Sequence, residues 1–337
     1  MGKMILAGDI GGTSARLAVF GVDGGRLQPV VSERYTSREY NDLEAIVRVF
    51  RAAHPIPLDH ACFGLPGPVV KGRVETPNLP WLVDAAELAR GIGLSSVGLL
   101  NDLEANAHGI FALEAADLVV LNPGSPHATG NSAVISAGTG LGEAGVYWDG
   151  RHHHPFACEG GHADFAPHTD LEVELLRYLR GKLAGHVSWE RVVSGPGLAN
   201  IYAFLRDTGR GAEPEWLRAA IGAGDPPAVI SAAALEGKSE LCVQALDVFV
   251  SAYAAEAGNL ALKVMATGGV YLGGGIAPKI LDKLTGPAFM RAFTAKGRLG
   301  PLLETVPVRV ILNDGTALLG AARWAALQVS APGVAAV

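Results

Sequence analysis

The sequence predicts an α/β protein built from two similar units, each of which opens with a glycine-rich β-hairpin. The first hairpin reads MILAGDIGGTSARLAVF (4–20), and the second reads AVISAGTGLGEAGVYW (133–148). In both, an apolar strand leads into a turn of small residues, and another apolar strand follows. Gly11 and Gly138 hold equivalent places. Because glycine lets main-chain N–H groups approach an anion, the pair predicts a duplicated fold that binds phosphate with both halves.

Size and composition agree with a well-packed protein of roughly two domains. The chain has 337 residues, of which 49% are hydrophobic and 18% charged. Its net charge is −6, and it has no dense run of Lys or Arg. A nucleic-acid partner or an anionic membrane surface is therefore not expected.

Targeting and cysteine signals indicate a cytoplasmic protein. No apolar run approaches the ~20 residues of a membrane span, and the N-terminal apolar stretch is too short for a signal peptide. Cys62, Cys158 and Cys242 are scattered, without CxxC spacing. That pattern suits a reducing compartment and argues against disulfides or a cysteine zinc site.

The first half alternates strands and helices after its hairpin. We expect strands at 4–8, 15–20 and 27–35, and a helix from about Asp42 with Asn41 and Glu44 as a capping arrangement. The strand HACFGL (60–65) enters a Gly- and Pro-rich loop, 64–81, that we expect to lack regular structure. The strand VGLL then ends on Asn101-Asp102, and a helix (103–113) follows at once.

The second half repeats this scheme from Asn131 with two long insertions. We expect helical structure at 170–205 with a break at Ser194–Gly197, and a long buried helix at 240–266. The segment GGVYLGGG (268–275) reads as a strand and a glycine turn that opens a helix at 276–278. A strand VPVRVIL (306–312) precedes the last helix, 315–328, which Asn313 or Asp314 could cap. By analogy with a duplicated fold, we expect this helix to pack back on the first half.

An ordered set of motifs over nearly the whole chain carries a family resemblance. The motifs are GDIGGT (8–13), GPV (67–69) with NLPW (78–81), NDLEANA (101–107), SAGTGLG (136–142), EGGHADFAP (159–167), GHVSWERVVSGPGL (185–198) and GGVYLGGGIAPK (268–279). In this order they resemble bacterial glucokinases of the non-zinc type, in the hexokinase–actin–Hsp70 superfamily.

The resemblance implies a duplicated ribonuclease H-like fold of the actin/hexokinase type, with two domains and a cleft between them. Residues 1–103 plus 315–330 would form the smaller domain, 104–314 the larger, and 331–337 a flexible tail. It also implies ATP-dependent phosphorylation of D-glucose at its 6-hydroxyl, with closure of the domains excluding water.

The glycine turns are the candidate nucleotide site. The GDIGGT turn would bind phosphates through main-chain donors and the Thr13 hydroxyl, and Asp9 would hold Mg²⁺ directly or through water. Alone, the turn also reads as an ordinary hairpin with Asp9 as turn former. The GGG turn equally fits a packing-driven connection, but the resemblance assigns it to the adenosine pocket. The predicted nucleotide contacts are Gly8, Asp9, Ile10, Gly11, Gly12, Thr13, Gly138, Thr139, Gly140, Gly273, Gly274 and Gly275.

Asn101 and Asp102 stand where a strand ends and a helix begins, a usual place for site residues in an α/β sheet. By residue type alone, both read as helix caps. In the family, the aspartate at this place takes the proton from the attacking sugar hydroxyl. A hydroxyl is a poor nucleophile at neutral pH, so Asp102 is our predicted general base and sugar ligand. Asn101 would bind a neighbouring hydroxyl.

The EGGH loop supplies the predicted sugar contacts. By resemblance, Glu159, His162 and Glu190 meet the sugar, together with Asn78 of NLPW. Zinc-bearing relatives pair such a histidine with clustered cysteines, but here Cys158 stands alone, so no zinc is expected.

Three further patterns do not carry the chemistry they suggest. Residues 140–145 match GxGxxG, yet a strand pattern follows where a dinucleotide site needs a helix. Gly237-Lys238-Ser239 lacks the earlier glycine of a P-loop. His152–His154 reads as a solvated loop, because three adjacent residues do not easily face one metal.

Two alternatives stay open at this point. One is a kinase for another hexose, such as fructose, mannose or an amino sugar. The other is a sugar-sensing regulator without catalysis, which we disfavour because Asp9 comes almost at the start and leaves no room for a DNA-binding segment. For its oligomeric state, a homodimer is one option.

Overall fold

The computed structural model describes residues 2–24, 26–77, 79–183 and 185–330. The chain divides into two compact units. The first comprises residues up to Ala115, Pro155–Ala157 and residues from Asn313; the second comprises Ala116–His154 and Cys158–Leu312. The predicted sugar contact Asn78 and the tail expected at 331–337 lie outside the described residues.

The first unit is built on a five-stranded sheet in the order β3-β2-β1-β4-β7. Strands β1, β2 and β3 pair antiparallel, whereas β1, β4 and β7 run parallel. The strands are β1 (Lys3–Ile10), β2 (Ser14–Asp23), β3 (Arg26–Thr36), β4 (His60–Leu65) and β7 (Val97–Asn101).

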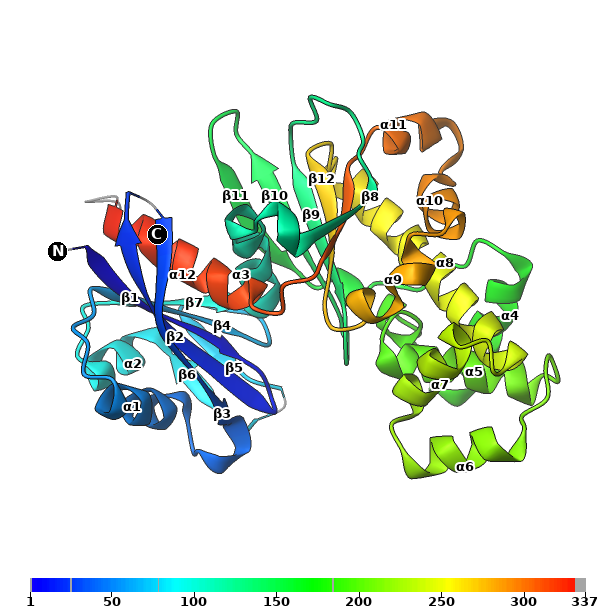
Figure 1. Ribbon diagram of the computed structural model, residues 1–337, viewed down its shortest axis with the longest axis horizontal. Coiled ribbons are helices and arrows are strands. Elements are labelled where there is room, and N and C mark those ends of the chain that lie inside the picture. Colours follow the sequence, from blue (N-terminus) through cyan, green and yellow to red (C-terminus); the bar gives the residue numbers. More distant parts are fainter. Residues whose placement is uncertain (1, 25, 78, 184, 331–337) are drawn as a thin grey trace. The chain divides into compact units, whose positions relative to one another are not determined.

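Helices cover both faces of this sheet (Figure 1). Side chains of a strand point alternately to opposite faces, so Leu6 packs with helices α1 and α2, while Ile5 packs with α3 and α12. The helices are α1 (Leu43–Ala53), α2 (Ala85–Ile92), α3 (Asp102–Gly109) and α12 (Thr316–Ser330). The last helix therefore packs on the first unit, against α3, β1 and β4, as the sequence predicts.

A second sheet of six strands, β11-β10-β9-β12-β13-β8, repeats this strand pattern, and apart from Pro155–Ala157 of β11 it belongs to the second unit. The hairpin β9-β10 is antiparallel, and β9, β12 and β13 run parallel, as β1, β4 and β7 do. The duplicated fold predicted from the paired hairpins is thus confirmed. The strands are β8 (Leu118–Asn122), β9 (Ser132–Ala137), β10 (Leu141–Trp148), β11 (His153–Cys158), β12 (Gly269–Gly273) and β13 (Val308–Ile311).

Helices inserted between these strands form the rest of the second unit. The central helix α8 is buried on most of its circumference, and Tyr253 at its middle is fully buried. The α-helices are α4 (Asp170–Lys182), α5 (Gly195–Asp207), α6 (Glu215–Ala223), α7 (Pro226–Leu235), α8 (Glu240–Val264), α9 (Leu281–Leu284), α10 (Pro287–Thr294) and α11 (Gly300–Glu304).

Several local predictions need correction. The N-cap of α1 is Asp42, which accepts a hydrogen bond from the Ala45 amide at 2.7 Å, and not Asn41. The loop 64–81 is not wholly irregular, because β5 (Arg73–Glu75) pairs with β6 (Leu82–Asp84). His153 and His154 begin strand β11 instead of lying in a loop.

Two glycine-rich segments also differ from expectation. Ser194 caps α5 and accepts from the Gly197 amide at 3.0 Å, so the SGPG segment starts a helix instead of breaking one. After β12 the chain forms a 3₁₀ turn, Ala277–Ile280, followed by the four-residue α9, so no long helix begins at 276.

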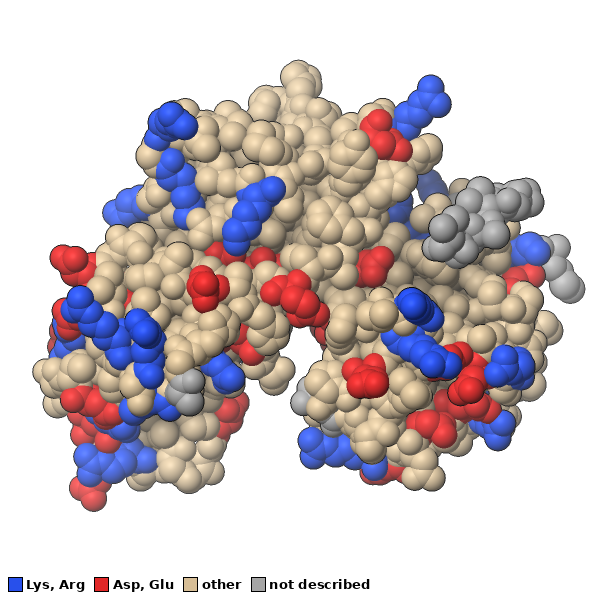
Figure 2. Space-filling view, turned by 180° about the vertical axis from the view of Figure 1, so that it is seen from behind, with Lys and Arg blue, Asp and Glu red and all other residues tan. Residues whose placement is uncertain are grey.

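Surface chemistry is mixed. Basic and acidic side chains are interspersed on the face shown in Figure 2. None of the described helices combines the length and apolar character needed to cross a membrane.

Candidate functional site

In the first unit, the predicted base and the first glycine turn lie at one edge of the sheet. The parallel strands β1, β4 and β7 end together there, because Asp9 pairs with Gly64 and Leu65 pairs with Asn101 in the strand register. Asp102 follows as the first residue of α3 and is partly buried. Sequence positions nearly a hundred residues apart are thus brought to the same edge.

Asp102 stands in the electrostatic environment that favours a carboxylate. Its Oδ1 accepts a hydrogen bond from the Leu103 amide at 2.9 Å. The N-terminal end of a helix carries a partial positive charge, which stabilises an anion. Gly64 of β4 lies against this first turn: a Cβ there would stand 3.0 Å from the Ala105 Cβ and 3.9 Å from the Asp102 Cα.

Both the oxygen and the nitrogen of the Asn101 side-chain amide form hydrogen bonds with the backbone. Its Oδ1 caps α3 by accepting from the amides of Leu103 (2.9 Å) and Glu104 (3.3 Å). Its Nδ2 donates to the Gly67 carbonyl at 3.2 Å. The helix-cap interpretation, which residue type alone favoured, therefore describes its observed contacts.

Asp9 is the acidic group of the first turn. Burial raises the pKa of its carboxyl; the nearby Arg16 guanidinium lowers it, and the Asp314 carboxylate raises it. Arg16 is itself paired with Asp314 at 2.8 Å. Mg²⁺ usually takes one or two protein carboxylates and keeps several waters, so a single partly buried aspartate fits such an ion.

The first turn is closed from within and held from outside. The Gly11 amide donates to the Ser14 carbonyl at 2.8 Å, so it stabilises the turn itself. Sequence reasoning missed Ser37, which is fully buried; its hydroxyl donates to the Gly11 carbonyl at 2.7 Å and its amide to the Thr13 carbonyl at 3.0 Å. No local signal near the turn announces this residue, because it comes from the far end of β3.

Two of the predicted nucleotide contacts face the core of the first unit. Ile10 is 1% exposed among the hydrophobic side chains between the sheet and α1. At Gly8 a Cβ would stand 2.4 Å from a ring atom of Phe63, so this glycine serves close packing of β1 on β4.

In the second unit, the other two glycine turns leave the same sheet edge side by side. Strands β9 and β12 are neighbours, with Ser136 opposite Gly273. The Ile276 amide donates to the Ala137 carbonyl at 3.2 Å. Gly274 needs to be glycine, because its φ is 81° and a Cβ would stand 2.2 Å from the Ala137 oxygen.

Helix α5 adds its N-terminus to the second turn. The Gly195 amide donates to the Gly138 carbonyl at 2.8 Å, while the Gly138 amide closes the turn on the Gly140 carbonyl at 2.9 Å. Because Ser194 caps α5, the positive end of a 13-residue helix stands beside Gly138–Gly140. From the sequence we predicted only a helix break at Ser194–Gly197.

The EGGH loop lies directly on this turn. It leaves β11 at Glu159 and makes one 3₁₀ turn, Gly160–His162. Gly161 sits against the start of β10, where a Cβ would be 2.0 Å from the Leu141 oxygen. Glu159 and His162 are both exposed, so they are available to a ligand.

Glu190 joins the same group of residues. The Trp189 amide donates to the Ala163 carbonyl at 3.0 Å, which holds the 3₁₀ turn Trp189–Arg191 on the loop. The Oε2 of Glu190 accepts from the Leu141 amide at 3.0 Å. The second unit thus brings the predicted sugar contacts next to the second glycine turn.

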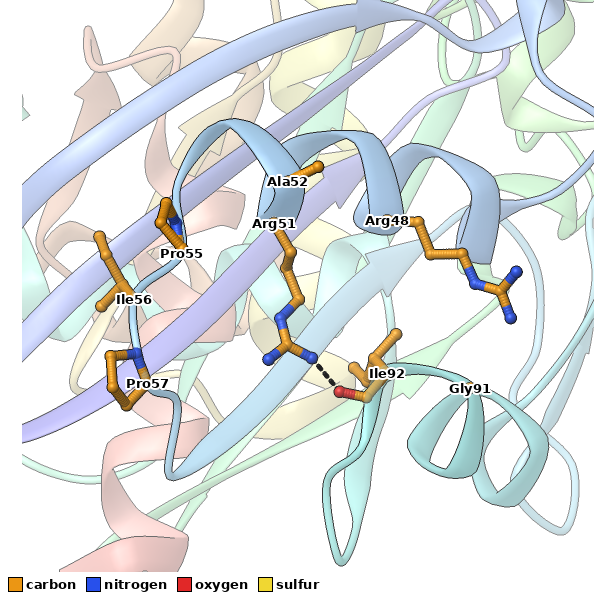
Figure 3. A pocket seen from close by; sticks show the side chains of 8 residues that line it. All are labelled: Arg48, Arg51, Ala52, Pro55, Ile56, Pro57, Gly91 and Ile92. Atoms are coloured by element: carbon orange, nitrogen blue, oxygen red, sulfur yellow. Dashed lines mark hydrogen bonds between the residues drawn. The ribbon is translucent and has the colours of Figure 1, made fainter.

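Surface hollows of the first unit lie elsewhere. One of about 450 Å³ lies between α1 and α2 (Figure 3). There the Arg51 guanidinium reaches back to the Ile92 carbonyl, and no predicted site residue lines the hollow. It offers no support for a ligand site.

Comparisons with known proteins agree with one another. A family model described as Glucokinase matches residues 6–328. The chain is 43% identical to a glucokinase of Nostoc punctiforme over 96% of this chain and 99% of that protein. The crystal structure of a glucokinase from an Antarctic psychrotroph matches with a TM-score of 0.85 at 31% identity, covering 96% of this chain and 99% of that one. A ROK-family glucokinase from Streptomyces griseus, solved with glucose and AMPPNP, has the same fold at a TM-score of 0.62 and 22% identity, covering 96% and 99%.

Proposed function

Because the chain belongs to the glucokinase family, we propose that it transfers the γ-phosphoryl group of ATP to the 6-hydroxyl of D-glucose, with Asp102 as general base. That the chain is a glucose kinase follows from its likeness to glucokinases over almost its whole length. The donor, the metal ion and the residue roles are the parts that we propose. The observation that carries them is the position of Asp102 at the sheet edge that also bears Asp9 and the first glycine turn.

The Asp102 carboxylate performs the proton transfer. It accepts the proton of the 6-hydroxyl while that oxygen attacks the γ-phosphorus, and the bond from phosphorus to the bridging oxygen of ADP breaks. A carboxylate suits this task because it is ionised at neutral pH, and the first turn of α3 favours its charge.

Sugar recognition falls to the EGGH loop and its neighbour. Glu159, His162 and Glu190 offer acceptors and a donor to several hydroxyl groups of a hexose, and their exposure or half-exposure suits a ligand that enters from solvent. Asn78 keeps its proposed place as a fourth contact by resemblance. The hydrogen bond from the Leu141 amide orients one oxygen of Glu190.

Nucleotide binding falls to the three glycine turns. The N-terminus of α5 beside Gly138–Gly140 favours a phosphate group, and the exposed Gly274 and Gly275 let the backbone lie against a flat base. Asp9 would hold Mg²⁺, which neutralises charge on the phosphates. The complex of the Streptomyces griseus protein with AMPPNP supports ATP as donor.

Kinetics with the purified protein test the proposal. ADP release is measured across glucose, fructose, mannose and amino sugars, with ATP, polyphosphate and ADP as donors. Glucose with ATP is expected to give the highest kcat/KM. The Asp102→Ala variant is expected to lose about a thousandfold in kcat while calorimetric glucose affinity changes little.

A matched control separates the base from a general loss of charge. Glu87 is an exposed acid in the first turn of α2 in the same unit, and Glu87→Ala is expected to leave turnover unchanged. Near-normal kcat in Asp102→Ala would show that another group takes the proton.

A further inference from the structure

A buried glutamate lies directly beneath the sugar-binding loop. Glu143 of β10 is 1% exposed. A Cβ on Gly160 would stand 1.9 Å from its Oε2, so the loop between Glu159 and His162 rests on this carboxyl group. Only glycine at position 160 permits such a close approach.

The partner of Glu143 is a second buried acid, Glu256 of α8, which is 0% exposed. Lys263 pairs with one oxygen of Glu256 at 3.0 Å, and the Asn259 amide donates to the other at 2.8 Å. Both oxygens of Glu256 thus accept hydrogen bonds. Neither oxygen of Glu143 receives a hydrogen bond from an N–H or O–H group of the described residues.

The two carboxyl groups can share a hydrogen bond only if one of them carries a proton. Because Glu256 has two donors and Glu143 has none, the proton belongs on Glu143. Glu143 then donates to Glu256 and presents a neutral group to the backbone of the loop.

We propose that Glu143, held in its protonated form by Glu256, is a positioning residue for glucose: it supports the loop that carries Glu159 and His162. This inference rests on the proposed sugar-binding role of that loop. In this role Glu143 contacts no reacting atom. It affects glucose affinity because it fixes the position of Gly160 and thereby of the loop.

The support that Glu143 gives to the loop is expected to depend on pH. Burial, followed by the charge of Glu256, raises the pKa of Glu143 to about 8, and Lys263 acts in the opposite direction. When the proton leaves, a second negative charge lies beside Glu256 and near Glu159, and like charges repel in a poorly solvated site. The loop is then displaced, so the KM for glucose is expected to rise above about pH 8.

The remaining groups around Glu143 do not produce that change. Tyr253 of α8 and Cys158 of β11 both have raised pKa values because they are buried, so they stay neutral in this range. Lys296 donates to Asn259 at 2.6 Å, and burial lowers its pKa. Lys296 is therefore the other group whose titration could change the KM for glucose.

The experiment compares wild type with Glu143→Gln and Glu143→Ala from about pH 6 to about pH 9.5, measuring kcat and the KM values for glucose and ATP. Glutamine keeps the shape and neutrality of the protonated acid. Glu143→Gln is expected to retain the neutral-pH KM for glucose and to lose the alkaline rise that wild type shows. Glu143→Ala is expected to raise the KM for glucose about tenfold at neutral pH, with the KM for ATP nearly unchanged. Glu240→Gln, at an exposed position on α8, the helix of Glu256, is the control and should follow wild type.

The outcomes distinguish the two levels of the proposal. Wild type without glucose turnover at neutral pH overturns the proposed function. If wild type turns over glucose normally and Glu143→Gln shows the same alkaline rise in the KM for glucose, only the role of Glu143 is overturned. The titration then belongs to Lys296 or another group. If Glu143→Ala fails to fold, the glutamine variant still decides.

Discussion

The carboxylate of Glu190 is fixed to the second glycine turn, since its Oε2 accepts the Leu141 amide at 3.0 Å. Leu141 is the first residue of β10 and follows the turn Gly138–Gly140. A predicted sugar contact and a predicted phosphate-binding turn therefore share a hydrogen bond. A change in the position of either one is therefore expected to disturb the other.

Gly140→Ala is expected to disturb the sugar contact. A Cβ at this position would stand 2.4 Å from Glu190 Oε2, so the carboxylate must move. We expect the KM for glucose to rise about tenfold. The control is Gly138→Ala, where a Cβ meets no atom within 4 Å. This variant is expected to leave the KM for glucose unchanged and to raise only the KM for ATP. Equal glucose KM values in the two variants would contradict the coupling.

Gly64→Ala is expected to lower kcat by displacing the base. The added Cβ would stand 3.0 Å from the Ala105 Cβ, so the first turn of α3, with Asp102, must shift outward by a few tenths of an ångström. A loss of about tenfold in kcat is expected, because proton transfer depends on such distances. Gly21→Ala, in β2 of the same sheet, meets nothing closer than 3.7 Å and serves as control. Thermal melting of both variants shows whether a loss of folding explains the result.

Asn101 variants separate capping from sugar binding. Asn101→Asp keeps an oxygen that can cap α3, whereas Asn101→Ala removes it and is expected to cost about 1 kcal/mol in the free energy of unfolding. The aspartate variant still loses the hydrogen bond from Nδ2 to the Gly67 carbonyl, so some loss of stability is expected. If the side chain serves the structure alone, Asn101→Asp keeps the wild-type glucose KM. A raised glucose KM in Asn101→Asp would instead indicate contact with the sugar through the amide nitrogen.

Much of the fold was predictable because its signals are local. Alternating apolar residues mark β1, β2, β9 and β10, and the glycine turns between them stand out in the sequence. The long apolar helix α8 was equally plain. A shift of one residue, as between Asn41 and Asp42 at the start of α1, is beyond such patterns, because both residues make good caps.

The parts that sequence reasoning missed depend on contacts between distant segments. Ser37 clamps the first turn from the end of β3, and nothing in its neighbours indicates this. Glu143 and Glu256 interrupt apolar segments that read as core, and only the packed structure shows that they face each other. In the SGPG segment, two glycines and a proline suggest a break, yet a serine cap followed by proline in the first turn also starts helices.

His108 is expected to make the folded state sensitive to acid. It is 8% exposed on α3, and burial, followed by the nearby Arg323 guanidinium, lowers its pKa from 6.5 to about 4. In the unfolded chain this imidazole takes up a proton below about pH 6.5, whereas the folded state resists protonation until about pH 4. The free energy of unfolding therefore falls as pH drops through this window, by at most about 1.4 kcal/mol per pH unit from this group.

The measurement is urea unfolding of wild type and His108→Gln at several pH values between these limits. Carboxylates titrate in the same range, so the difference between the two proteins isolates the histidine. His108→Gln is expected to lose less stability on acidification than wild type. His127→Gln, at an exposed position, is expected to lose as much stability as wild type. Parallel curves for all three proteins would show that His108 binds its proton equally well in the folded and unfolded states.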